Sequence, residues 1–447
     1  MKIKMPQGFG GPTLAFWIWA TIVSSGCTGN MAYRTDYKPC VSLQPVSECS
    51  TAALEEYADP ANPDQSYALG FVEFDDQGEL YDRRQMHALL DYIYKVASRD
   101  DLLITVFVHG WHHNAKVDDS NVSNFRRSLL ALSKLERSDA RASKRKTRKI
   151  IGVYVGWRGE SITVPVLNNL TFYGRKDTAQ TVGHGGVTEL LARLEEIRDT
   201  RESMRASGES DTNRLVVVGH SFGGAVVFSA LSQILLERFV DTKGPVGMAS
   251  TTRGFGDLVI LINPAFEAMQ FASLSDAANE RGSYFLQQAP VLAIMTSEKD
   301  YATKYAFWGG RALSTVFDSH RTVSRLNKGS GTQQEIDQAE ADRNTVGHFE
   351  PFITHRLDPD STLESADMLT VLDSVREGWA KDAPGKSIRF RGSVLNHLDK
   401  SVTRNPYLNI QVDKKIIPGH NEIYDPRVLD FLANLIMLST TENEAAK

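Results

Sequence analysis

The sequence predicts an α/β protein with a mostly parallel, doubly wound sheet that has helices on both faces. Apolar runs of strand length are continuous and do not alternate with polar residues, as in "LLITVFVHG" (Leu102–Gly110) and "KIIGVYVGW" (Lys149–Trp157). Segments with helical spacing separate these runs, for example "NFRRSLLALSKLE" (Asn124–Glu136). Buried strands that alternate with helices are typical of a parallel sheet covered on both sides.

The expected elements follow one another from residue 67. Strands are predicted at Tyr67–Phe74, Leu102–Gly110, Lys149–Trp157, Arg214–Gly219, Asp257–Asn263 and Ala289–Ser297. Helices are predicted at Arg83–Ser98, Asn124–Glu136, Val187–Thr200 and Phe222–Arg238. A last strand-like segment covers Tyr407–Ile417, and the final helix begins at Pro426, with Asp425 as its N-cap.

Residues 315–387 interrupt this pattern. They are polar, as in "NKGSGTQQEIDQAEADRN", and too long for an ordinary connection between elements. We therefore expect them to form an insertion over the carboxyl edge of the sheet, and this insertion is a candidate lid. The domain as a whole is expected to cover residues 67–435, and residues 436–447 are expected to be a disordered tail.

The stretch "LVVVGHSFGGAVV" (Leu215–Val227) carries the strongest functional signal. "GHSFG" fits the pattern G-x-S-x-G, with a strand before it and a helix after it. A strand that turns directly into a helix forces the apex residue, Ser221, into a strained backbone. Side chains two places before and after the apex would collide, which explains Gly219 and Gly223. The hydroxyl of Ser221 is thereby exposed at a helix N-terminus, where the amide of Phe222 points at developing negative charge.

A second motif, "VFVHGWHHN" (Val106–Asn114), ends an earlier buried strand with His109 and Gly110. At this point the chain resembles the α/β-hydrolase superfamily in its serine esterase and lipase branch, over roughly residues 67–435. The resemblance implies the α/β-hydrolase fold and an oxyanion hole formed by the backbone amides of Trp111 and Phe222. The "HGGG" run of that family is absent. The resemblance also makes His220 a structural neighbour of the nucleophile in the turn, and not the base.

The partners of Ser221 are expected in the chain order serine, acid, histidine. A serine hydroxyl needs a base to take its proton, and the base needs a carboxylate to orient it. By resemblance the acid follows the strand at Ala289–Ser297, where Asp300 is the first choice and Glu298 the reserve. By the same resemblance His420, between the last strand and the final helix, is the base. His397 and His348 remain alternatives as base.

The N-terminus predicts export. Lys2 and Lys4 precede an apolar core of ten residues, "LAFWIWATIV", which is too short to cross a bilayer as a helix. "SSGC" follows, ending at Cys27. A charged start, a short apolar core and small residues describe a secretory signal. The cysteine makes residues 1–27 resemble a bacterial lipoprotein signal peptide, which implies lipid attachment at Cys27. An ordinary cleaved signal and an uncleaved anchor stay open.

Composition limits the remaining classes. The net charge of −5 over 447 residues gives no basic footprint of the kind that nucleic-acid binding leaves, so no nucleic-acid partner is expected. Residues 28–66 are polar and irregular and are expected to be a tether. Cys40 and Cys49 lie in this segment, and outside the cytosol they are a candidate disulfide. Two cysteines without neighbouring histidines are poor zinc ligands, so the sequence predicts no metal site and no cofactor.

These observations predict an exported serine hydrolase of the cell envelope, lipid-anchored or periplasmic, that cleaves small-molecule or lipid carboxylic esters. The aromatic stretch "DYATKYAFWGG" (Asp300–Gly310) beside the expected acid suggests an apolar substrate pocket, although packing under a loop explains it equally well. Two other readings stay open. The same triad serves amidases, peptidases and acyltransferases, and a hydrolase-like scaffold can also act as a non-catalytic binding protein.

Overall fold

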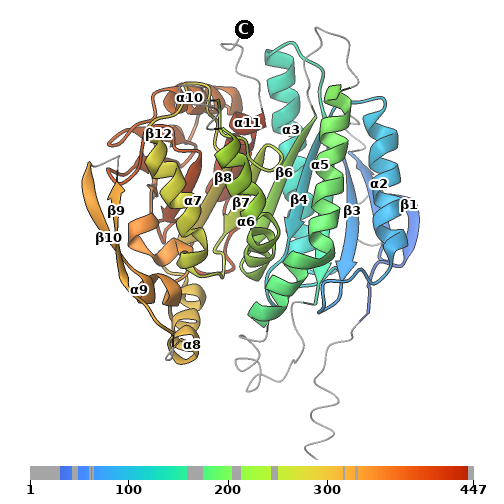
Figure 1. Ribbon diagram of the computed structural model, residues 1–447. Coiled ribbons are helices and arrows are strands. Elements are labelled where there is room, and N and C mark those ends of the chain that lie inside the picture. Colours follow the sequence, from blue (N-terminus) through green and yellow to red (C-terminus); the bar gives the residue numbers. More distant parts are fainter. Residues whose placement is uncertain are drawn as a thin grey trace, which may run out of the picture.

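The centre of the fold is a mixed sheet in which one long block of strands runs parallel (Figure 1). The computed structural model describes residues 31–42, 49–59, 62, 65–158, 175–203, 213–242, 250–315, 318–327 and 331–440. Within these residues the sheet has twelve strands, in the order β1-β2-β3-β5-β4-β6-β7-β8-β14-β11-β13-β12. Every neighbouring pair from β3 to β11 is parallel. The α/β class and the mostly parallel sheet expected from the sequence are confirmed.

The parallel block consists of the strands that the apolar runs predicted, together with one that they missed. Their bounds are β3 (Ser66–Phe74), β4 (Leu102–Val108), β5 (Lys149–Trp157), β6 (Arg214–His220), β7 (Leu258–Ile262), β8 (Leu292–Ser297), β11 (His355–Pro359) and β14 (Tyr407–Val412). Nearly every residue of β4, β5, β6, β7 and β8 is buried, because both faces of the sheet are covered. β11 is the missed strand.

Helices cover both faces of the sheet, as a doubly wound fold requires. One face packs against α2 (Arg83–Ala97), α5 (Thr188–Ser203), α6 (Phe222–Asp241) and α7 (Ala268–Arg281), and the other against α3 (Ser120–Ala142), α10 (Met368–Ala380) and α11 (Pro426–Thr440) (Figure 1). Alternate residues of β4 divide between the two cores: Ile104 and Val106 face the first, and Leu103 and Phe107 face the second. Helix α6 is long and apolar enough to span a membrane, but it is a core helix, with eleven residues buried in the protein.

The N-terminal segment differs from the expected tether. In the described part of residues 28–66, β1 (Asp36–Ser42) and β2 (Ala52–Ala58) pair with each other and extend the sheet beyond β3. Cys40 and Cys49 form a disulfide between them. Arg34 is fully buried: its guanidinium pairs with Glu55 at 2.9 Å and lies over the ring of Phe71. These contacts of Arg34 hold the N-terminal segment against the domain. The polar composition of the segment did not suggest such an attachment. Residues 1–27, with Cys27, lie outside the described residues.

The C-terminal half also departs from expectation. We expected all of residues 315–387 to lie outside the sheet, but β11 and α10 belong to its main layers, and β12 (Ser387–Phe390) and β13 (Ser393–His397) complete its edge. The hairpin of β9 (Thr322–Asn327) and β10 (Thr332–Asp337) and the short helix α9 (Gln338–Arg343) stand apart from the sheet (Figure 1). The tail expected at 436–447 is wrong in its first part, because α11 continues to Thr440 and buries Met437 and Leu438.

Candidate active site

Ser221 lies at the sharp turn between β6 and α6. Strand β6 ends at His220 and helix α6 begins at Phe222, so the serine alone makes the turn. Its backbone has φ 57° and ψ −123°, a conformation that L-residues rarely adopt. The flanking glycines allow it. A Cβ on Gly219 would lie 2.6 Å from the carbonyl oxygen of Gly223, and a Cβ on Gly223 would lie 2.1 Å from that of Val108. The collision expected from the sequence is therefore present in the structure.

Three side chains from distant parts of the chain meet at this turn in one line of hydrogen bonds. The Nε2 atom of His420 lies 2.7 Å from Oγ of Ser221, and its Nδ1 atom lies 2.8 Å from Oδ2 of Asp300. Ser221 follows β6, Asp300 follows β8, and His420 follows β14, so all three lie at the carboxyl edge of the parallel strands. Loops at this edge are where open α/β sheets place their ligand sites.

Asp300 is built to stay ionised. Its side chain is fully buried, and the backbone amides of Ala302 and Thr303 both donate to Oδ1 at 3.1 Å. Burial alone would raise the pKa of Asp300, but hydrogen bonds from His420 and Thr303 outweigh burial and leave the pKa below its ordinary value. Glu298, the reserve acid, points elsewhere and forms an ion pair with Arg356. The structure thus brings Asp300 and not Glu298 to the imidazole.

Two buried residues hold the backbone of His420 in place. His220 Nε2 lies 3.0 Å from the carbonyl oxygen of His420, and Asn263 Nδ2 donates to the same oxygen at 2.8 Å. Burial lowers the pKa of His220 to about 3, so its ring is neutral, and the proton on Nε2 makes this bond. Asn263 also accepts from the amide of Ser297 at 3.0 Å. It therefore ties the histidine loop to the end of β8, the strand that leads to Asp300.

Sequence reasoning missed Asn263, although a signal for it existed. It ends the apolar run of β7 at the same edge of the sheet as Ser221, and a polar residue directly after a buried strand is a candidate for a functional role. Its φ of 45° is tolerated because asparagine visits the left-handed region more readily than most residues. His220 was expected only as a structural neighbour, and its hydrogen bond to the carbonyl of His420 gives that expectation a specific contact.

The loop after β4 lies directly against the serine. A Cβ on Gly110 would sit 2.8 Å from Cβ of Ser221, so a glycine is required at this contact. His109 is fully buried, its Nδ1 lies 2.8 Å from the carbonyl oxygen of Gly110, and its Nε2 accepts from the amide of Trp157 at 3.0 Å. Burial lowers the pKa of His109 to about 4, so the ring is neutral with its proton on Nδ1. This bond fixes the Gly110–Trp111 peptide, whose N–H belongs to Trp111.

The aromatic stretch beside Asp300 is mostly exposed. Tyr301, Tyr305 and Trp308 have 59%, 59% and 47% of their surface exposed, and the rings of Tyr301 and Tyr305 stack at 5.6 Å. Phe307 is fully buried. The stretch forms η2 (Ala302–Ala306) and the start of α8 (Phe307–Ser314), so only Phe307 fits the expectation of packing under a loop. The other three rings are exposed in the segment that directly follows the acid.

The alternative bases are accounted for. His348 lies behind the acid, with Nε2 3.1 Å from Oγ1 of Thr303, and burial lowers its pKa to about 4. It therefore supports the turn that holds Asp300. His397 belongs to a separate buried group with His355 and Asp382. That group is one of two sets of His and Asp side chains that come close enough to hold a metal ion within the described residues; the other is Asp318, His320 and Asp342.

The arrangement has the parts of a nucleophilic centre: a hydroxyl, an imidazole in contact with it, and a buried carboxylate that orients the imidazole. Such a line of groups can move a proton from the hydroxyl to the ring as the oxygen attacks an electrophile. No family model matches this chain, and a search of curated proteins found no match either.

Proposed function

We propose that this protein is a serine hydrolase with the α/β-hydrolase fold and that it cleaves carboxylic esters through an acyl-enzyme on Ser221. One observation carries the proposal: His420 lies within hydrogen-bonding distance of both Ser221 and Asp300, at 2.7 and 2.8 Å. The chain order of serine, acid and histidine, and the turn that carries the serine, support the same assignment. The roles are nucleophile for Ser221, base for His420 and orienting acid for Asp300.

The mechanism follows from the hydrogen bonds. His420 Nε2 accepts the hydroxyl proton as Ser221 Oγ attacks the ester carbonyl, and the Nδ1–H bond to Asp300 stabilises the imidazolium that forms. The tetrahedral intermediate collapses when the imidazolium returns the proton to the leaving alcohol. Water then attacks the acyl-enzyme with His420 again as base, which releases the acid and restores the serine.

The oxyanion is assigned to the backbone amides of Phe222 and Trp111. Phe222 is the first residue of α6, where amides point away from the helix toward the preceding turn. Trp111 follows Gly110, whose close approach to Ser221 and bond from His109 orient the peptide between them. Loss of one such donor lowers turnover about 10²–10³-fold in enzymes of this kind.

The substrate class that the surroundings favour is an ester with an apolar part, taken from a small molecule or a lipid. The exposed rings of Tyr301, Tyr305 and Trp308 beside Asp300 provide an apolar surface for it. The Cys40–Cys49 disulfide supports an oxidising compartment outside the cytosol. With Cys27 as the lipid-attachment residue, we place the protein in the cell envelope, anchored to the membrane.

A fluorophosphonate probe and a series of p-nitrophenyl esters of rising acyl length test the proposal. We expect the wild-type protein to be labelled and to turn over short to medium chains. The Ser221→Ala variant should not be labelled, and its turnover should be at least about 10³-fold lower than that of the wild-type protein. Labelling that persists in Ser221→Ala would remove the serine from the mechanism. Turnover of amides in preference to esters, or transfer to an added alcohol, would instead assign the triad to an amidase or an acyltransferase.

A further inference from the structure

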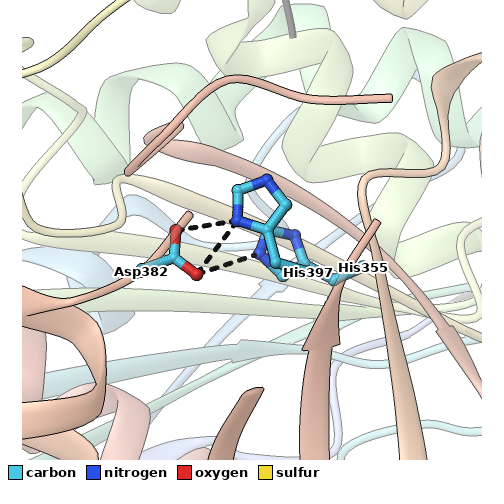
Figure 2. A group of neighbouring side chains, drawn as sticks. All are labelled: His355, Asp382 and His397. Atoms are coloured by element: carbon cyan, nitrogen blue, oxygen red, sulfur yellow. Dashed lines mark hydrogen bonds and ion pairs between the residues drawn. The ribbon is translucent and has the colours of Figure 1, made fainter. Parts of the chain in front are cut away.

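A second group of polar side chains lies on the outer strands of the sheet, separated from the serine strand by β7, β8 and β14. His355 and His397 are paired directly across the antiparallel strands β11 and β13, and Asp382 comes from the loop between α10 and β12. Figure 2 shows the carboxylate of Asp382 beside both rings. All three side chains are buried, with 0%, 3% and 1% of their surfaces exposed, respectively.

The contacts within this group are close but incomplete. Nδ1 of His397 lies 3.0 Å from both carboxylate oxygens of Asp382, while Nε2 of His355 lies 3.8 Å from Oδ1. Nε2 of each histidine is buried and has no hydrogen-bond partner. The amide of Arg404 donates to Oδ2 of Asp382 at 3.1 Å. Nε2 of His355 calls for an explanation, because it faces the carboxylate and a buried nitrogen without a partner costs free energy.

The hydrogen bonds of Thr354 favour one tautomer of His355. The Thr354 hydroxyl donates to the carbonyl of Asn409 at 3.2 Å and accepts from the amide of Asn409 at 2.9 Å. Its remaining lone pair faces Nδ1 of His355 at 2.9 Å, so Nδ1 carries the proton of a neutral ring. Nε2 then presents a lone pair to the carboxylate of Asp382. In this tautomer two electron-rich atoms face each other across 3.8 Å in a buried space, which favours a cation between them.

We propose that His355, Asp382 and His397 bind a divalent transition-metal ion, and that zinc fits them best. Two imidazole nitrogens and one carboxylate oxygen are a donor set that zinc takes. Tetrahedral ligands about 2.1 Å from an ion are about 3.4 Å from one another. The two nitrogen–oxygen separations, 3.0 and 3.8 Å, bracket that value.

The surroundings fit an ion better than a proton. Nε2 of His355 is buried without a hydrogen-bond partner and faces Oδ1 of Asp382 at 3.8 Å, a gap that an ion can bridge. Thr354 holds Nδ1 of His355 and the Arg404 amide holds Asp382, and such outer contacts orient metal ligands elsewhere. When the ion binds, the proton of His397 moves from Nδ1 to Nε2, so the ring stays neutral and Nδ1 is free to coordinate the ion. A water molecule completes the fourth position, so the ion joins β11, β13 and the loop before β12.

The other candidate group, Asp318, His320 and Asp342, serves as the internal comparison. It lies at the surface, and its carboxylate at Asp342 already forms an ion pair with Arg311 at 2.6 Å. The negative charges of this group are therefore already compensated by solvent and by Arg311. We expect no tight binding there.

The test measures metal binding directly and does not depend on hydrolase activity. The full-length protein is stripped with a chelator and titrated with Zn²⁺, and bound zinc is counted by mass spectrometry. We expect one equivalent bound below micromolar concentration and a rise of about 5 °C or more in the midpoint of thermal unfolding. A stripped wild-type protein that binds no zinc at micromolar concentration overturns the proposal.

Variants locate the ion. His397→Gln and Asp382→Asn should lose the tight equivalent, while His320→Gln and His420→Gln, matched changes at the surface group and at the serine site, should keep it. If either control variant loses the tightly bound zinc while His397→Gln and Asp382→Asn keep it, the metal binds elsewhere and the assignment is wrong. If the first pair fails to fold, Co²⁺ added to the stripped wild-type protein decides: absorption bands of a four-coordinate ion with nitrogen ligands support the site, and a hexaaqua spectrum overturns it.

Discussion

Replacing Gly223 by alanine tests whether the turn at Ser221 is held by close backbone contact. Alanine normally stabilises a helix relative to glycine by up to about 1 kcal/mol. At this position the added Cβ would lie 2.1 Å from the carbonyl oxygen of Val108 and 2.5 Å from that of His109. Both atoms belong to the backbone at the end of β4, so no side chain can rotate away to make room.

The size of the effect follows from these contacts. To reach even 3.0 Å, the first turn of α6 and the end of β4 must separate by about 1 Å, and overpacking of this kind costs about 1–3 kcal/mol or more. The movement also shifts Ser221 relative to His420. A misplacement of about 1 Å lowers turnover roughly 10²-fold. We therefore expect Gly223→Ala to lose stability and activity together.

Urea unfolding and the rate of fluorophosphonate labelling measure the two effects. Gly309→Ala is the matched control, because Gly309 also lies in a helix but nothing lies within 4 Å of an added Cβ. The control should be as stable as the wild-type protein or more stable, with unchanged labelling. If Gly223→Ala unfolds within about 0.5 kcal/mol of the wild-type protein and labels at the same rate, the close-contact explanation is wrong.

Three further outcomes are expected. Asn263→Ala removes the donor to the carbonyl of the histidine loop, so kcat on a p-nitrophenyl ester should fall about 10-fold with little change in KM; an unchanged kcat would contradict the positioning role. His109 and His220 stay neutral in the folded state, whereas the same histidines in the unfolded chain become protonated below pH 6.5. The free energy of unfolding should therefore decrease by about 2 kcal/mol for each histidine as the pH is lowered from 7.5 to 5. Urea midpoints that do not change over this range would refute this. Replacing Cys40 and Cys49 by serine should lower the free energy of unfolding by about 2–3 kcal/mol relative to the disulfide-bonded wild-type protein, and the reduced wild-type protein should match the variant.

The parts of the fold that the sequence predicted are those with strong local signals. Strand β4 and the middle of β6 are apolar runs, and the glycines around Ser221 have a steric reason that can be stated without a structure. The choice between Glu298 and Asp300 was beyond the sequence. The backbone amides of Ala302 and Thr303 donate to Asp300, while Arg356 on β11, nearly sixty residues away in the chain, forms an ion pair with Glu298.

The outer strands could not be predicted because their signals are long-range. β11 ("HRLDP") and β13 ("SVLNH") are short and mix apolar with polar residues, as loops do. Pairing with β14 and with each other makes them strands, and the sequence alone does not reveal that pairing. The group of His355, Asp382 and His397 was hidden for the same reason, since its members are spread over about forty residues with no metal-binding spacing.

The burial of Arg34 limits how far the protein can stand from its attachment point. Six residues lie between Cys27 and this arginine, and the seven steps from one Cα atom to the next span about 25 Å at most when fully extended. With a lipid on Cys27, as we propose, a short linker on the β1 side of the sheet would hold the folded domain close to the membrane. Such an enzyme would act on esters at the bilayer surface, and esters dissolved farther away would have to diffuse to it.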